Sequence, residues 1–152
     1  MRYHYQNDYE KLAVDCPPKS YKPKKILAFR WVFENLSDER NFQSQYEKHM
    51  KNPKPPKRYN DMGDSDKCEA MALSMFDTLE NARKRFFFLK NEQPLPMNEN
   101  AFRFLGTHIA RGEIIETDGV NQDSDRKGHF NHHPFEDLDY KTRFQIVEAL
   151  KI

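Results

Sequence analysis

The stretch that most constrains the fold runs over residues 70–90, where AMALSMF is followed by DTLENARKRFFFLK. The first part is a short apolar run of the length of a buried strand. The second part begins with Asp77 and has Glu80 three residues later, a pairing typical of a helix start. Apolar side chains then recur at helical spacing, at Leu79, Ala82, Phe86 and Leu89. A strand that leads directly into an amphipathic helix indicates a domain containing both kinds of structure.

The remaining segments extend this pattern into an α+β fold. We expect a small single domain with a mixed or split β-sheet, a few flanking helices and long polar loops. The run ILAFRWVF and the partly alternating stretch THIARGEIIE favour strands, and the sequence starting at Ser37 as an N-cap favours a short helix. The predicted elements are strands at 26–33 and 107–116, helices at 37–50 and 137–150, and loops at 51–67, 93–100 and 121–128.

Length and charge limit the class of protein. The chain has 152 residues, which suits one domain, and its net charge of +1 gives no global field for nucleic acid or membrane. Residues 1–25 are rich in Lys and Pro and predict an extended basic N-terminal arm. Residues 26–152 predict the α+β domain, which the Pro- and Lys-rich loop at 51–67 interrupts.

Cysteine use and hydropathy indicate a compartment. Cys16 and Cys68 have neither CxxC spacing nor the company of a secreted disulfide framework. The N-terminus has no apolar core of a signal peptide, and no apolar run approaches the roughly 20 residues that span a bilayer. We therefore expect a cytoplasmic protein with reduced thiols and no membrane partner.

Three of the six histidines fall within GHFNHHPF, residues 128–135. His129 and His132 have a spacing that two metal ligands could use, but the other ligands would have to come from afar, for example from Cys68, His108 or Asp123. The chain has none of the common zinc-enzyme motifs, so we expect no metal. A polar loop and a loop that contacts substrate stay open as readings of the cluster.

Other catalytic and binding motifs are absent or weak. The sequence has no GxSxG elbow, no GxGxxG and no GxxxxGK[ST], and Cys68 reads as a small core residue. Basic residues gather between Lys48 and Arg58 and again at 83–85, beside aromatic residues. Cations next to stacking rings are what single-stranded nucleic acid needs, so RNA binding is one alternative.

The last constellation spans three predicted strands. Arg30 lies inside an apolar run, where its guanidinium needs an internal carboxylate or an anionic ligand. Ser74 lies in AMALSMF, and Glu113 and Glu116 lie in the later strand. This order of arginine, serine and glutamate resembles the R-S-E pattern of ADP-ribosyltransferase-like proteins. The GEIIE spacing leaves open which glutamate would match the family's catalytic one.

The resemblance implies an enzyme that uses NAD as co-substrate to modify a nucleic acid or a protein. It implies that Arg30 holds the phosphates, that Ser74 orients the substrate, and that Glu113 or Glu116 stabilises an oxocarbenium-like state. Rings such as Trp31, Phe76 or Phe130 would stack on nicotinamide. We expect His129 or His132 to contact the dinucleotide or to position the acceptor.

A cellular role follows from the same resemblance. A short single-domain form suits a bacterial toxin or a phage-defence effector, with a cognate antitoxin or inhibitor protein as partner. The alternative from a different class is a non-enzymatic interaction module, such as an antitoxin, immunity or inhibitor protein. Abundant charge and the lack of a strict catalytic motif fit that class.

Overall fold

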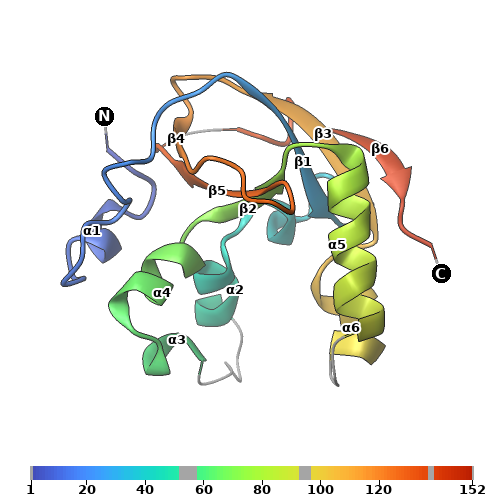
Figure 1. Cartoon of the computed structure of the whole chain (residues 1–152), viewed down its shortest axis with the longest axis horizontal. Coiled ribbons are helices and arrows are strands. Elements are labelled where there is room, and N and C mark those ends of the chain that lie inside the picture. The colour runs from blue at the N-terminus through green and yellow to red at the C-terminus, as the bar shows by residue number, and fades with distance from the viewer. Residues whose placement is uncertain (1, 52–57, 93–96, 137–138, 152) are drawn as a thin grey trace.

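The chain forms the α+β domain that its sequence predicts, built on one six-stranded sheet (Figure 1). The computed structural model describes residues 2–51, 58–92, 97–136 and 139–151. Every strand pair is antiparallel, so the sheet is not mixed, and the strand order is β4-β5-β2-β1-β3-β6. The strands are β1 (Ile26–Val32), β2 (Leu73–Phe76), β3 (His108–Ile114), β4 (Gly119–Asn121), β5 (His129–Pro134) and β6 (Gln145–Ala149).

The helices form two groups, one toward each end of the sheet. Figure 1 shows α5 and α6 side by side at one end, and α1 to α4 toward the other. Within the described residues these are α1 (Gln6–Tyr9), the 3-10 helix η1 (Glu39–Phe42), α2 (Gln45–Lys51), α3 (Arg58–Asp61), α4 (Asp64–Ala70), α5 (Leu79–Glu92) and α6 (Met97–Phe104).

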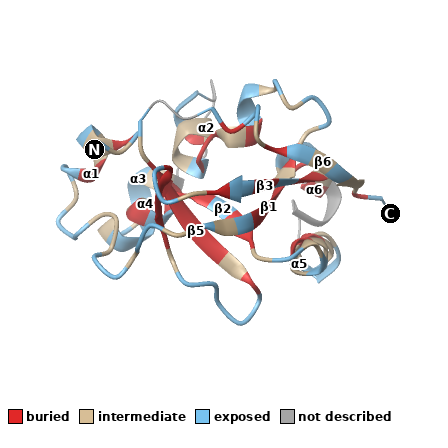
Figure 2. Ribbon diagram, turned by 90° about the horizontal axis from the view of Figure 1, so that it is seen from above, coloured by how far each residue is buried: buried red, intermediate tan, exposed pale blue. Residues whose placement is uncertain are grey.

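Successive side chains of a strand point to opposite faces of the sheet, and both faces are partly covered. Phe29 and Phe76 point to one face and pack with Ala82 and Phe86 of α5; we call this the α5 face. The opposite face, which we call the Tyr140 face, carries the other two core positions of β2. There Leu73 and Met75 pack with Phe130, Tyr140 and Phe144. Figure 2 shows the resulting burial of β2 and β5, in contrast to the exposed outer side of α5.

The junction between β1 and β2 nearly divides the sheet. These two strands share only the register pair Phe29↔Phe76, whereas β1 and β3 pair along their whole length, from Ile26↔Ile114 to Val32↔His108. Of the two sheet types expected from the sequence, the split form is therefore the closer description.

The predicted helix over 137–150 is wrong for the residues that the structure describes. Residues 141–143 form a turn, and 145–149 form β6, which pairs with β3. Tyr140 and Phe144 are buried in the core of the Tyr140 face, so their four-residue spacing reflects one turn against a sheet. The Phe144 ring lies directly against Gly112, where a Cβ atom would collide with it.

Four shorter predictions also need correction. The stretch 128–135 is not a loop, because residues 129–134 form β5. The helix predicted over 37–50 is two separate helices, η1 and α2, and the cap of the first is Asp38 rather than Ser37. The loop predicted over 51–67 includes α3 and the start of α4, while its residues 52–57 lie outside the described part. Residues 93–96 of the predicted loop at 93–100 also lie outside it, and α6 begins at Met97.

The N-terminal segment differs from the extended arm that its composition suggests. It contains α1, and Tyr5 and Tyr9 are buried in a small cluster with Met71. Farther along, Lys22 pairs with Asn121 at the outer edge of β4. A disulfide joins Cys16 to Cys68 of α4, so the expectation of reduced thiols is wrong for this structure. Among the described residues, every helix is too short or too polar to cross a bilayer.

Candidate functional site

An exposed serine and a half-buried histidine are hydrogen-bonded to each other on the α5 face of two central strands. Ser74 is the one exposed residue of β2, whose other three residues are buried. The register Phe76↔His129 places His129 of β5 diagonally opposite Ser74 on the same face. The Ser74 Oγ lies 2.5 Å from the His129 Nε2. Two residues predicted as site residues from sequence are therefore in direct contact.

A carboxylate approaches the other nitrogen of the same ring. Asp125 Oδ2 lies 4.0 Å from His129 Nδ1. The other carboxylate oxygen accepts the backbone N–H groups of Lys127 at 2.8 Å and His129 at 3.0 Å, which fixes the turn before β5. Sequence reasoning missed Asp125, because the turn that brings it back to the ring of His129 depends on backbone hydrogen bonds of a loop read only as polar.

Gly128 makes this turn possible. Its φ of +74° is a left-handed conformation that favours glycine, and a Cβ atom there would collide with Asp77 and Asn81. The Gly128 carbonyl accepts the backbone N–H of Asp77 at 2.9 Å, which joins the loop to the start of α5. The position of Asp125 beside His129 is thus tied to the strand-to-helix unit.

The charge states suit proton transfer between Ser74 and His129. Burial, aided by the positive charge of Arg85, lowers the pKa of His129 despite the opposing effect of Asp125. Although partial burial alone would raise it, the backbone N–H groups of His129 and Lys127 hold the pKa of Asp125 below its usual range. At neutral pH the imidazole is neutral and the carboxylate is ionised. A ring with its proton on Nδ1, facing Asp125, accepts the Ser74 hydroxyl proton at Nε2.

The aromatic residues proposed to stack on a ligand instead support the histidine. Phe76 meets the His129 ring edge to face at 5.4 Å and is itself buried. Trp31 packs against Phe76 at 5.1 Å, and its indole N–H donates to the Ala82 carbonyl at 2.9 Å. Both rings belong to the core under α5, and Phe76 packs directly against His129. Phe130 is buried on the opposite face.

Arg30 is buried and is satisfied by neither of the partners that its sequence context suggests. Its guanidinium donates to three backbone carbonyls, at Asn41 (2.7 Å), Gln43 (3.1 Å) and Ser74 (2.6 Å). Burial lowers its pKa to about 10, which leaves it charged at neutral pH. Arg30 therefore fastens the backbone of Ser74 from the Tyr140 face, while the Ser74 side chain points to the α5 face.

His132 lies on the Tyr140 face, three residues along β5 from His129. Its Nδ1 is 2.7 Å from Asn121 Oδ1 and its Nε2 is 2.5 Å from the Tyr140 hydroxyl. Burial lowers its pKa to about 3. Both ring nitrogens are engaged within the core, so His132 does not join Ser74 and His129.

The two glutamates also lie apart from the serine. Glu113 is exposed on β3 and pairs with Lys25 at 3.8 Å, and Glu116 is exposed in the following turn. Glu113 lies two strands away from Ser74, and four residues farther along β3 than the position level with Ser74. On ordinary sheet spacings, Glu113 is therefore roughly 16 Å from Ser74. Neither side chain reaches the Ser74–His129 pair in this structure.

A basic and aromatic patch adjoins the pair. Phe88 of α5 is 41% exposed, with the Arg85 guanidinium 4.8 Å and the Lys127 ammonium 5.8 Å from its ring centre. We call Arg85, Phe88 and Lys127 the basic–aromatic patch. Of the two other cations at the start of α5, Arg83 pairs with Glu148 and Lys84 pairs with Glu80.

A cavity of about 400 Å³ lies on the Tyr140 face, and neither Ser74 nor His129 lines it. Leu73 and Tyr140 form part of its wall, with three acids, Asp38, Glu39 and Asp139, against Lys141 and His4. A wall with this excess of negative charge repels a nucleotide diphosphate. Ser74 and His129 on the α5 face are therefore the better candidate site, although they do not line this cavity.

Comparisons of the chain with protein-family models, with curated proteins and with solved structures gave no match.

Proposed function

We propose that the protein transfers ADP-ribose from NAD at the site formed by Ser74, His129 and Asp125. The observation that carries the proposal is the exposed Ser74 hydroxyl hydrogen-bonded to a neutral imidazole in the middle of a sheet. Four residues that the resemblance to ADP-ribosyltransferases implicates, namely Trp31, Ser74, Phe76 and His129, are contiguous here. NAD as co-substrate also implies a cytoplasmic protein.

The chemistry assigns new roles to several groups. Cleavage of the bond between nicotinamide and ribose develops positive charge on the ribose, and an ionised carboxylate stabilises it. Asp125 takes this role in place of Glu113 or Glu116, because it is the carboxylate beside the Ser74–His129 pair. Neutral His129 accepts a proton from the attacking hydroxyl group, and Ser74 orients the ribose. Arg85 and Lys127 meet the phosphates, a role that buried Arg30 leaves unfilled.

The basic–aromatic patch supports a single-stranded nucleic acid as the acceptor. The exposed Phe88 ring offers a stacking platform for a base of the acceptor, beside the two cations that meet the phosphates of NAD. An enzyme of this kind would consume NAD and modify nucleic acid in a cell, as a toxin or phage-defence effector does, and would require a cognate inhibitor protein.

The test is release of nicotinamide from NAD by the purified protein, with and without single-stranded RNA. His129→Ala should lower the rate by about 10²-fold or more, as removal of a general base does. His108→Ala is the matched control, because His108, at the start of β3, contacts its neighbour Thr107 and lies outside the site. Label transfer to an added protein but not to RNA would replace the nucleic-acid acceptor. No release of nicotinamide under any condition would reject ADP-ribosyl transfer.

A second function is favoured by one specific observation. Serine at Nε2 and a carboxylate on the Nδ1 side of one imidazole is the order of groups in serine hydrolases, in which the serine is the nucleophile. A fluorophosphonate probe separates the two functions. Covalent labelling of Ser74, lost in His129→Ala, would support acyl transfer, whereas ADP-ribosyl transfer leaves Ser74 unlabelled.

A further inference from the structure

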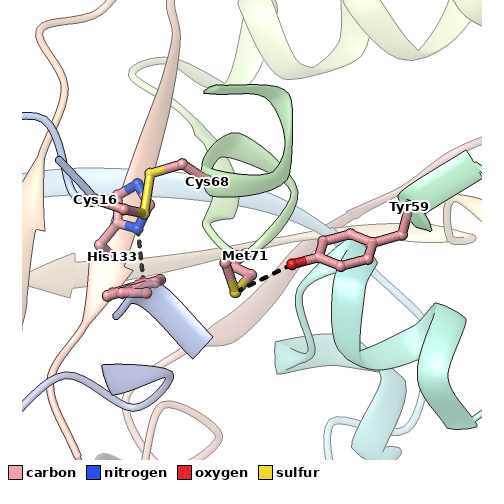
Figure 3. Close-up of a disulfide and its surroundings, with 6 residues drawn as sticks. Cys16, Tyr59, Cys68, Met71 and His133 are labelled. Carbon is pink, nitrogen blue, oxygen red and sulfur yellow. Dashed lines mark hydrogen bonds between the residues drawn. A yellow bond between two sulfur atoms is a disulfide. The ribbon is translucent and has the colours of Figure 1, made fainter. Parts of the chain in front are cut away.

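A second cluster of reactive side chains lies away from Ser74 and His129, where the N-terminal segment meets α4 and β5. The disulfide of Cys16 and Cys68 lies beside the imidazole of His133 (Figure 3). One sulfur from each cysteine and one ring nitrogen of His133 all lie within 4.8 Å of one another. Cys68 and His133 are buried, and Cys16 is half-buried.

These are the donors of a thiolate–imidazole metal site. Zinc-class ions bind cysteine sulfur at about 2.3 Å and histidine nitrogen at about 2.0 Å. Thiolates on a tetrahedral ion lie about 3.8 Å apart, which is farther than in a disulfide but spanned by a small rotation of each side chain. The Cα atoms of Cys16 and Cys68 are 5.7 Å apart, so the backbone already brings both side chains to one centre.

The surroundings of His133 suit this residue to bind a metal ion. Its Nδ1 is 2.7 Å from the Tyr9 hydroxyl, and Tyr9 and Tyr21 pack against the ring. The His133 ring is buried, and the nitrogen that faces away from Tyr9 keeps a lone pair when Nδ1 carries the ring proton. A hydrogen-bond partner on one ring nitrogen orients the other toward a metal in most histidine sites. Tyr9 is therefore a positioning residue for His133.

We propose that Cys16, Cys68 and His133 form a redox-gated site that binds a zinc-class divalent cation when the disulfide is reduced. Reduction adds two electrons and two protons, supplied by a thiol or dithiol reductant, which is itself oxidised to its disulfide. Binding of the cation then displaces the two thiol protons and forms two metal–sulfur bonds and one metal–nitrogen bond. Three protein donors leave the fourth position of the tetrahedron for solvent.

The two forms hold the same segments together by different bonds. Cys16 belongs to the N-terminal segment, Cys68 to α4 and His133 to β5, so the metal form crosslinks three parts of the chain and the disulfide two. Reduction without metal releases the link between residues 16 and 68. This inference does not depend on the function proposed for Ser74 and His129.

The experiment compares oxidised and reduced full-length protein titrated with Co²⁺. The protein is reduced with a phosphine, the reductant is removed without air, and visible absorption is followed. We expect one Co²⁺ per chain with the intense bands of tetrahedral thiolate ligation in the reduced form, and no such bands in the oxidised form. Zn²⁺ should displace the Co²⁺ and protect both thiols from alkylation.

Variants identify the ligands. Cys16→Ser with Cys68→Ser should abolish binding, and Tyr9→Phe, which keeps the ring but not the hydroxyl, should weaken it about 10-fold. His108→Ala is the histidine control and should bind like the unaltered protein. Circular dichroism checks that each reduced protein is folded. A folded, reduced protein that takes up no Co²⁺, or a double serine variant that binds it equally well, would overturn the proposal.

Discussion

His129 and His132 lie three residues apart on β5, yet their surroundings are opposite. His132 is enclosed on the Tyr140 face, with Asn121 and Tyr140 on its two nitrogens. His129 is 29% exposed on the α5 face and contacts one exposed hydroxyl and a half-exposed carboxylate. A polar group whose every bond is made inside the core contributes to stability, whereas one that shares its bonds with an exposed serine is available for chemistry. The predictions below separate these two kinds of residue.

The largest expected effect is on stability, at Arg30 of the Tyr140 face. Arg30→Met should lower the free energy of unfolding by about 4 kcal/mol, because it leaves the carbonyls of Asn41, Gln43 and Ser74 buried without their donor. Denaturation by urea measures the change, with Arg111→Met on the exposed side of β3 as control. A fully stable Arg30→Met protein that had lost only NAD affinity would restore the phosphate-binding role implied by the family resemblance.

The next effect tests the two histidines directly. His132→Ala should cost about 3 kcal/mol of unfolding free energy, because it opens a cavity, leaves the Asn121 side-chain carbonyl without its partner, and leaves the Tyr140 hydroxyl with only the Asp118 carbonyl at 3.5 Å. His129→Ala should cost less than about 1 kcal/mol, since its partners remain in reach of water. Equal losses of stability in the two variants would remove the distinction drawn between the faces.

Stability should also fall as the pH is lowered from 7 to 5. His132 and His133 have pKa values of about 3 in the folded protein, below the ordinary value of 6.5, because burial disfavours the charged ring. The unfolded chain therefore binds more protons than the folded one below pH 6.5, and stability decreases by roughly 2 kcal/mol for each ring over this range. Urea denaturation at several pH values measures the slope, which His132→Gln should halve. A stability that does not change between pH 7 and 5 would contradict the burial of these rings.

The smallest expected effect concerns ligand binding on the α5 face. Phe88→Ala should weaken binding of single-stranded RNA by about 10-fold, the usual contribution of one stacked base. Phe104→Ala is a matched control, because that ring is also exposed and lies near Arg103 on α6, outside the basic–aromatic patch. Fluorescence anisotropy over a series of salt concentrations measures both variants. Equal effects of the two substitutions would show binding that is not centred on the patch.

Sequence patterns predicted the elements whose residues agree with local rules. The strand at 26–33, the strand-to-helix unit at 70–90 and the strand at 107–116 are present with shifted ends as β1, β2 with α5, and β3. The segment 137–150 was wrongly predicted as a helix, because Tyr140 and Phe144 have a helical spacing in the sequence. Their burial instead depends on Gly112 and β3, which are distant in the chain. Local spacing does not reveal which distant surface covers a residue.

The candidate site was predictable only in part, for the same reason. Ser74 and His129 were identified as candidates, but their contact depends on the pairing of β2 with β5. The side-chain hydrogen-bond partners of the three histidines of β5 lie in four separate segments, at Tyr9, Ser74, Asn121 and Tyr140. Because distant segments supply the hydrogen-bond partners of these side chains, the sequence of β5 by itself resembles that of a polar loop. Arg30 was predicted to need a partner. Every residue has a backbone carbonyl, so the sequence does not show which carbonyls accept hydrogen bonds from Arg30.

The pairing of Lys22 with Asn121 has a consequence for self-association. A strand at the border of a sheet offers unpaired amide and carbonyl groups to other chains, and such borders promote aggregation. The exchange of backbone hydrogen bonds between Lys22 and Asn121, at 3.1 Å and 2.8 Å, closes the border at β4 with the protein's own N-terminal segment. The link from Cys16 to Cys68 holds the same segment in place six residues earlier in the chain. Loss of that link would remove one of the restraints that keep Lys22 paired with the edge strand β4.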